Sequence, residues 1–158
     1  MDNIPEAFQT QCMRRFVILF LLVLGTPLAA SAAEPPLVEV WKSPTCGCCT
    51  VWVRHLEAAG FRVQVTDLVD VAPVKQRFAV PPELASCHTA RVAGYVVEGH
   101  VPAGDIARLL REQPRVRGLF VPGMPVGSPG MEGAGARPYE VLAVDGAGST
   151  TVFATHGP

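Results

Sequence analysis

The fold is decided by residues 37–66, which read LVEVWKSPTCGCCTVWVRHLEAAGFRVQVT. Residues 37–41 alternate between apolar and polar side chains, which predicts a β-strand. Residues 50–59 carry a broad apolar face and are followed by Gly60, which predicts an α-helix that ends at a glycine. Residues 61–66 alternate again and predict a second strand. We expect the two strands to be parallel and joined by a right-handed crossover.

Three cysteines, Cys46, Cys48 and Cys49, lie in the turn of this unit. A Cys-x-x-Cys pair in the turn between the first strand and the first helix is the thioredoxin-like arrangement. We therefore predict an α/β fold of thioredoxin-like type, with a central mixed sheet and flanking helices.

The rest of the chain fits this fold class. Residues 71–78 and 102–113 predict further helices, and residues 95–97 predict a third strand. Residues 118–138 hold six glycines and four prolines, which predicts a long loop. The last predicted element is a C-terminal β-hairpin formed by residues 139–144 and 150–153.

The first 33 residues have the pattern of a secretory signal peptide. Arg14 and Arg15 precede an apolar run of nine residues, 16–24, and the small residues at 29–33 supply an Ala-x-Ala cleavage site. Nine apolar residues are too few to span a bilayer, so we expect no membrane anchor to remain after cleavage.

The predicted mature chain, residues 34–158, is a single thioredoxin-like metal-binding domain in the periplasm, an oxidising compartment. A start at Met13 would give the more typical signal peptide. The full chain has 13 lysines and arginines against 14 aspartates and glutamates, a net charge of −1, which argues against a nucleic-acid partner. Its composition of 49% hydrophobic and 17% charged residues excludes a wholly disordered chain.

Removal of the signal segment takes Cys12 away and leaves four cysteines. These are Cys46, Cys48, Cys49 and Cys87. The first three lie at a predicted helix N-terminus, where free backbone N–H groups and the helix dipole stabilise thiolates. Thiolates are nucleophiles and also soft metal ligands, so the spacing alone allows either disulfide exchange or metal binding.

Three features favour a metal site. A dithiol–disulfide couple needs two thiols, whereas this cluster has three. Cys87 and His88 add a thiol and an imidazole, in a turn that packs against the Cys-x-x-Cys loop of a thioredoxin-like fold. Met124 and Met131 lie in the glycine- and proline-rich loop, where a thioether suits Cu(I), a soft ion. Because thiolates can bridge metals, the four cysteines would be able to hold more than one Cu(I).

Each of these assignments has a structural alternative. The cysteines would then form only structural disulfides, or a four-thiolate Zn²⁺ site, although their close spacing strains a single tetrahedron. The two methionines would be incidental hydrophobic residues, and His88 a solvent-facing turn residue. We interpret His100 as a local hydrogen-bonding residue, His55 as a packing or surface residue, and His156 as part of a frayed C-terminus.

Four motifs, taken together and in order, resemble the CopG-like family of small exported proteins associated with copper resistance. They are VWKSPTCGCC at residues 40–49, SCHTA at 86–90, GYVVEGHVP at 94–102 and GMPVGSPGME at 123–132. The resemblance covers nearly all of the predicted mature chain. The resemblance implies a thioredoxin-like fold, copper binding at the Cys-x-Cys-Cys motif, and copper-linked redox activity in periplasmic copper handling.

Carried over by position, the resemblance also implies a ligand set. The thiol ligands would be Cys46, Cys48, Cys49 and Cys87, with support from Met124, Met131 and His88. The implied partners are copper ions and other periplasmic copper-handling proteins. The alternative function is a thiol–disulfide oxidoreductase with Cys46 and Cys49 as its catalytic pair. Ordinary thioredoxins place a cis-proline before the third strand, and residues 87–91 contain no proline, which argues against general exchange with protein substrates.

Overall fold

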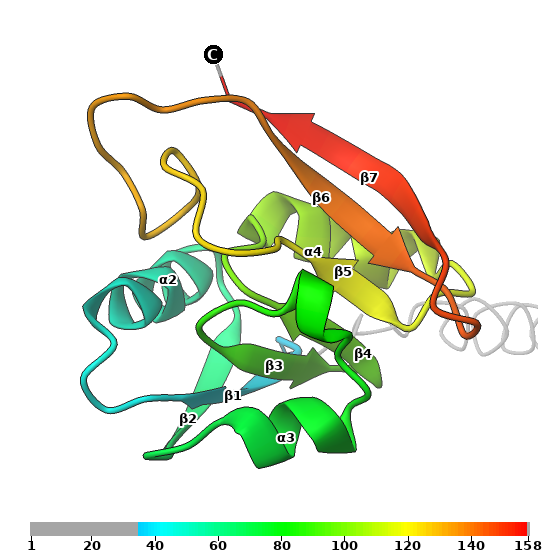
Figure 1. Ribbon diagram of the computed structural model, residues 1–158, viewed down its shortest axis with the longest axis horizontal. Helices are drawn as coiled ribbons and strands as arrows, with labels where there is room; N and C mark the ends of the chain where they lie inside the picture. Colours follow the sequence, from blue (N-terminus) through cyan, green and yellow to red (C-terminus); the bar gives the residue numbers. More distant parts are fainter. Residues whose placement is uncertain (1–34, 158) are drawn as a thin grey trace, which may run out of the picture. The chain divides into compact units, whose positions relative to one another are not determined.

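The computed structural model describes residues 35–157, which form a mixed β-sheet with helices on both of its faces (Figure 1). The predicted signal segment, residues 1–33, lies outside the described residues. Within the described part of the chain the strand order is β2-β1-β3-β4-β5-β6-β7. The strands are β1 (Leu37–Lys42), β2 (Arg62–Asp67), β3 (Thr89–Val92), β4 (Tyr95–Glu98), β5 (Gly118–Phe120), β6 (Tyr139–Val144) and β7 (Thr150–His156). The helical elements are α2 (Gly47–Ala58), α3 (Ala72–Arg77), the 3₁₀ turn η1 (Pro82–Leu84) and α4 (Ala103–Glu112).

The predicted α/β class is confirmed, and so is the unit from which it was inferred. β1 and β2 pair in parallel and are connected through α2. β3 is antiparallel to both β1 and β4, whereas β4 and β5 are parallel, which makes the sheet mixed. β6 and β7 form the expected C-terminal hairpin.

Helix α2 begins at Gly47, three residues before the predicted start, because a cysteine side chain caps it. Cys46 is the N-cap, with an extended backbone, and its sulfur accepts a hydrogen bond from the backbone N–H of Cys49 at 3.4 Å. Cys48 and Cys49 therefore lie in the first helical turn and not in a preceding loop. This places the thiols beside the free N–H groups of the helix.

Two strands, β3 and β5, were not predicted. β3 is only four residues long, and β5 only three, so neither gives a clear alternating pattern. Gly118 in β5 was interpreted as a loop residue. It is required in the sheet, because a Cβ at that position would lie 1.8 Å from the carbonyl oxygen of Val96 on β4.

Alternation along β4 and β5 divides the apolar side chains between two cores, one on each face of the sheet. Val97 and Leu119 join the larger core, which also contains the buried faces of α2 and α4. Val96 and Phe120 join the smaller core, together with Leu84 of η1. In Figure 1, α3 and η1 accordingly lie on the face opposite to α4.

The C-terminal strand is longer and better anchored than predicted. β7 extends to His156, whose Nε2 lies 2.6 Å from Oδ2 of Asp105 on α4. The ring of Tyr139 on β6 stacks on the His156 ring with a centroid separation of 5.5 Å. The interpretation of His156 as a frayed terminal residue is therefore wrong.

Candidate metal centre

The three clustered cysteines differ in their state. Cys46 and Cys49 are joined by a disulfide across the first turn of α2, with their Cα atoms 5.4 Å apart. Cys48 is a free thiol, and its sulfur lies 3.5 Å from that of Cys46. Cys49 is fully buried, whereas Cys46 and Cys48 are half-buried. The structure therefore places one free thiol directly against a disulfide.

Cys87 joins this group from the segment between η1 and β3. One ligand atom from each of Cys46, Cys48, Cys49 and Cys87 falls within 4.8 Å of the others. The four cysteines that the sequence singled out thus meet at one point, although Cys87 is distant in the chain. Thiolates at this separation are close enough to share a metal ion or to bridge two of them.

Burial raises the pKa of the Cys87 thiol to about 11, and the nearby Cys48 also contributes to the increase. Cys87 is therefore a neutral thiol near pH 7. A metal ion that binds this sulfur has to displace its proton, which couples binding to pH.

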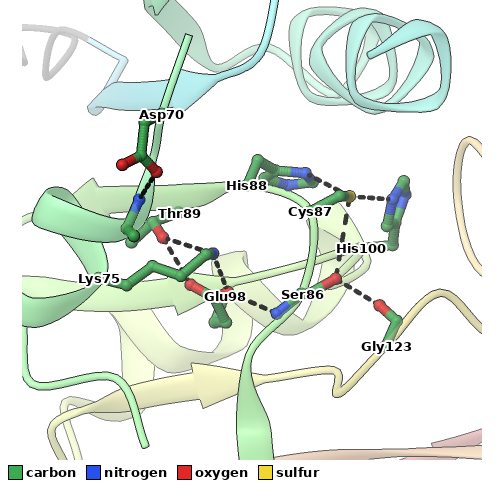
Figure 2. A network of polar contacts seen from close by, with 10 residues as sticks. Asp70, Lys75, Ser86, Cys87, His88, Thr89, Glu98, His100 and Gly123 are labelled. Atoms are coloured by element: carbon green, nitrogen blue, oxygen red, sulfur yellow. Dashed lines mark hydrogen bonds and ion pairs between the residues drawn. The ribbon is translucent and has the colours of Figure 1, made fainter. Parts of the chain in front are cut away.

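Two imidazoles converge on Cys87 and define a second candidate ligand group, Cys87 with His88 and His100 (Figure 2). His100 Nε2 lies 3.1 Å from the Cys87 sulfur, and His88 Nδ1 lies 3.4 Å from it. Burial lowers the pKa of both histidines, so both rings are neutral and keep a free lone pair near pH 7.

His100 is held in the orientation of a metal ligand. Its Nδ1–H donates to the carbonyl oxygen of Pro129 at 2.7 Å, because a carbonyl can only accept. That bond assigns the lone pair to Nε2, the atom that faces Cys87. Metal-binding histidines are oriented by such a bond from the second ring nitrogen. His100 is thus a hydrogen-bonding residue, as expected, but its partners Pro129 and Cys87 lie 29 and 13 positions away in the sequence.

His88 is fully buried, so the alternative of a solvent-facing turn residue is wrong. Its ring packs against Trp52 at a centroid separation of 4.2 Å. Nδ1 points toward the Cys87 sulfur (Figure 2), and Nε2 is the one buried side-chain nitrogen or oxygen of the described chain without a hydrogen-bond partner.

The proximity of His100 to Cys87 was not predicted, although the sequence carries a signal for it. Thr89 pairs with Glu98 in the β3–β4 hairpin, so the residues just before β3 and just after β4 come side by side. Cys87 and His100 occupy those positions, 13 residues apart in the sequence. Because β3 was not predicted, the proximity of Cys87 and His100 was not inferred from the sequence.

The methionine-bearing loop, residues 121–138, contacts the site through the backbone of Gly123 and Gly130. A Cβ on Gly130 would lie 2.6 Å from the Cys48 carbonyl oxygen and 3.3 Å from His100 Nδ1, so the loop backbone is in close contact with both. Gly123 accepts a hydrogen bond from Ser86 Oγ through its carbonyl. Met124 and Met131 each follow one of these glycines, and Met124 is half exposed. The contacts that hold the loop against the site are therefore made by the backbone of Gly123, Pro129 and Gly130.

His55 lies on α2 and has a structural contact. Its Nε2 accepts the backbone N–H of Ala103 at 3.0 Å, at the start of α4. Burial lowers the pKa of this imidazole, which keeps the accepting nitrogen unprotonated. The expectation of a packing role agrees with this geometry.

The helices within residues 35–157 lack the length and apolar character that a bilayer-spanning helix needs.

Comparison with known proteins gives matches to one family model and to solved structures. The family model described as "Protein of unknown function, DUF411" matches residues 84–131. A structure titled "Copper resistance protein copG- Form 2" is 45% identical, with a TM-score of 0.74, and the match covers 78% of this chain and 99% of that chain. A second, titled "Copper resistance protein copG- Form 1", is 44% identical with the same TM-score, and the match covers 79% and 100% of the two chains. No curated protein matches the chain.

Proposed function

Since the chain belongs to the CopG family of copper resistance proteins, we propose that it binds Cu(I) through the thiols of its Cys-x-Cys-Cys motif and Cys87. The observation that carries this proposal is the meeting of four cysteine sulfurs within 4.8 Å of one another. Thiolate is the protein ligand that Cu(I) prefers. Cys46, Cys48, Cys49 and Cys87 would all become available as ligands once the disulfide is reduced.

The disulfide gives the site a redox capacity that matches copper chemistry. Reduction of the Cys46–Cys49 disulfide consumes two electrons and two protons and gives two thiols. Reduction of two Cu(II) ions to two Cu(I) consumes the same number of electrons. We therefore propose that oxidation of the two thiols to the disulfide supplies the electrons for this conversion, with both thiol protons released.

His88 and His100 extend the ligand set on the side of Cys87. Their neutral nitrogens lie within 3.4 Å of the Cys87 sulfur, so a metal bound to that sulfur would find nitrogen ligands beside it. In our proposal Met124 and Met131 close over the site as soft thioether ligands. Leucine at either position would keep the bulk and remove the sulfur, and it should weaken Cu(I) binding.

We further propose that the protein acts in the periplasm, as a single domain of residues 34–158 after removal of residues 1–33. This location accords with the oxidised state of Cys46 and Cys49, since disulfides persist in exported proteins. Mass spectrometry of protein recovered from the periplasmic fraction, with a mature N-terminus near residue 34, would support export. An uncleaved cytoplasmic protein would contradict it.

A thiol–disulfide oxidoreductase is the second candidate, because a disulfide spans the N-terminus of α2 with a free thiol beside it. Thiolates at a helix N-terminus are good leaving groups in exchange reactions. The two functions differ in what they require of Cys48. Copper binding uses its sulfur, whereas exchange through Cys46 and Cys49 does not.

Competition for Cu(I) against a chromophoric chelator tests the proposal. Fully reduced wild-type protein should withdraw Cu(I) from the chelator, and Cys48→Ser should withdraw less. Reduction of insulin by metal-free protein is measured in parallel. The absence of Cu(I) transfer to the reduced wild type, together with insulin reduction that survives Cys48→Ser, would favour the oxidoreductase instead.

A further inference from the structure

A buried ion pair lies next to the candidate metal centre but contributes no ligand to it. The Glu98 carboxylate, at the end of β4, is fully buried, and its partner Lys75 on α3 is 15% exposed. Taking these charges out of water is costly unless each is well compensated. The compensation is visible in the hydrogen bonds that the carboxylate receives.

The Glu98 carboxylate joins three segments of the chain (Figure 2). Oε1 accepts from Lys75 Nζ and from the backbone N–H of Ser86, the latter at 2.7 Å. Oε2 accepts from Thr89 Oγ1, also at 2.7 Å, and Lys75 Nζ lies 3.1 Å from Thr89 Oγ1. The segments joined are α3, the turn after η1 and the start of β3. Asp70 secures the start of α3 by accepting the N–H of Ala72 at 2.8 Å.

Three residues of this network, Ser86, Thr89 and Glu98, lie within two positions of the Cys87–His88–His100 group. Ser86 immediately precedes Cys87, and Thr89 immediately follows His88. Glu98 itself precedes Gly99 and His100. The network therefore fixes the backbone on both sides of the Cys-His dipeptide and at the entrance to His100.

Gly99 makes this close arrangement possible. Its backbone has φ = +74°, and a Cβ there would lie 2.6 Å from the Cβ of Ser86. The Gly99 N–H also donates to the His88 carbonyl oxygen at 3.1 Å. The two strand ends are thus in contact, so a shift of the Ser86 turn changes the distance between Cys87 and His100.

We propose that Glu98 and Lys75 are a positioning pair, which holds the Cys87 sulfur and His100 Nε2 close enough to each other to bind the same metal ion. The proposal rests on the proposed copper function for its ligand, but the positioning itself is a property of the metal-free protein. A well-packed apolar pair could give comparable stability at such a site. The hydrogen bonds that Glu98 accepts from Ser86 and Thr89 connect this pair to the turn that carries Cys87 and His88.

The test compares Glu98→Gln and Thr89→Val with a matched control, Asp105→Asn. The glutamine side chain of the first variant can accept with one oxygen only, so at least one of the three donors then faces an amide NH₂ group. Thr89→Val keeps the ion pair and removes a single hydroxyl, so it remains informative if Glu98→Gln does not fold. Asp105→Asn also changes a buried carboxylate, which pairs with the partly exposed His156, but this pair lies outside the network.

Three quantities are measured for each folded variant: melting temperature, Cu(I) affinity by chelator competition, and the alkylation rate of Cys87. The alkylation rate is measured in metal-free Cys48→Ser protein with the Cys46–Cys49 disulfide intact, where Cys87 is the one free thiol of residues 34–158. Loss of support around bound-metal ligands costs about 10–100-fold in metal affinity. We expect a loss in that range for Glu98→Gln, a smaller loss for Thr89→Val, and a severalfold faster alkylation of Cys87 in both.

Asp105→Asn should lower the melting temperature while leaving Cu(I) affinity and Cys87 alkylation within twofold of wild type. The proposal is overturned if Glu98→Gln and Thr89→Val alter only the melting temperature, as the control does. If wild-type protein binds no Cu(I), the proposed function fails, and the alkylation rates still decide whether the pair positions Cys87.

Discussion

His100 Nε2 and the Cys87 sulfur lie 3.1 Å apart at the open end of the β3–β4 hairpin. The other nitrogen of the same ring donates to the Pro129 carbonyl oxygen, so its lone pair is directed at the thiol and not at solvent. This pair links the strand hairpin, which carries both residues, to the glycine-rich loop that covers them. A metal ion bound to the Cys87 sulfur would therefore meet the lone pair of His100 Nε2.

The first prediction concerns His100 as a nitrogen ligand. His100→Ala should lower Cu(I) affinity about 10-fold or more, because it removes the oriented Nε2 and leaves the thiols unchanged. His55→Ala is the control, since it removes a half-buried imidazole that accepts a hydrogen bond from the start of α4. The control should lower the melting temperature and not the affinity. Equal affinities for the two variants would contradict a ligand role for His100.

The second prediction separates the extra thiol from the disulfide pair. Cys48→Ser should lower the affinity of the reduced protein for Cu(I) by at least about tenfold, the lower limit for lost ligand support. The Cys46–Cys49 disulfide should still form, as measured by thiol titration before and after reduction. Val51→Ser, at an exposed position on the same helix, serves as the surface control. An unchanged affinity in Cys48→Ser would remove this thiol from the ligand set.

The third prediction is a pH dependence that arises from Cys87. Its thiol has a pKa raised to about 11, so metal binding at neutral pH releases one proton from it. Cu(I) affinity should therefore rise with pH up to that value, and Cys87→Ser should reduce the slope of log affinity against pH by one. A slope that is the same in wild type and Cys87→Ser would show that this sulfur does not bind the metal.

The same raised pKa makes a prediction about the metal-free fold. Because the folded state holds the Cys87 proton more tightly than the unfolded chain does, its contribution to stability is complete below the ordinary thiol pKa of 9.0. It is lost as pH rises from there to about 11. Denaturant unfolding of metal-free protein across this range should show a decline in stability that is smaller in Cys87→Ser. A decline of the same size in both would contradict the prediction.

The fifth prediction tests how the methionine-bearing loop packs against the site. Gly130→Ala would place a Cβ 2.6 Å from the Cys48 carbonyl oxygen, at a backbone φ of +89°. Gly135→Ala introduces a similar strain, at φ of +85°, but with open space around the Cβ. Gly130→Ala should therefore weaken Cu(I) binding and expose Cys48 to alkylation, whereas Gly135→Ala should not. Similar behaviour of the two variants would show that backbone strain alone accounts for the effect.

The sequence was most informative where a local pattern coincided with a local structure. The strand, cysteine turn and helix of residues 37–60 follow one another directly in the chain. Alternation, apolar spacing and a terminal glycine were therefore sufficient to predict them. The C-terminal hairpin was predictable for the same reason. The position of the helix start was not, because Cys46 acts as an N-cap through its sulfur, which is an uncommon capping group.

The features that were not predicted depend on packing between residues that are distant in the sequence. Gly118 begins a glycine- and proline-rich stretch that predicts a loop. It nevertheless belongs to a strand, because β4 approaches its Cα too closely for any side chain. His88 follows a cysteine in a turn and gives no local sign of being fully buried against Trp52. The Lys75–Glu98 pair joins residues 23 positions apart, so neither charge pattern nor periodicity indicates it.

The central claim, that the clustered thiols bind Cu(I), is tested most directly by copper X-ray absorption on reduced wild-type protein loaded with Cu(I). The account predicts an edge typical of Cu(I) and a first coordination shell dominated by sulfur, with a nitrogen contribution that His100→Ala diminishes. A first shell of nitrogen and oxygen alone, unchanged in Cys48→Ser and Cys87→Ser, would contradict it.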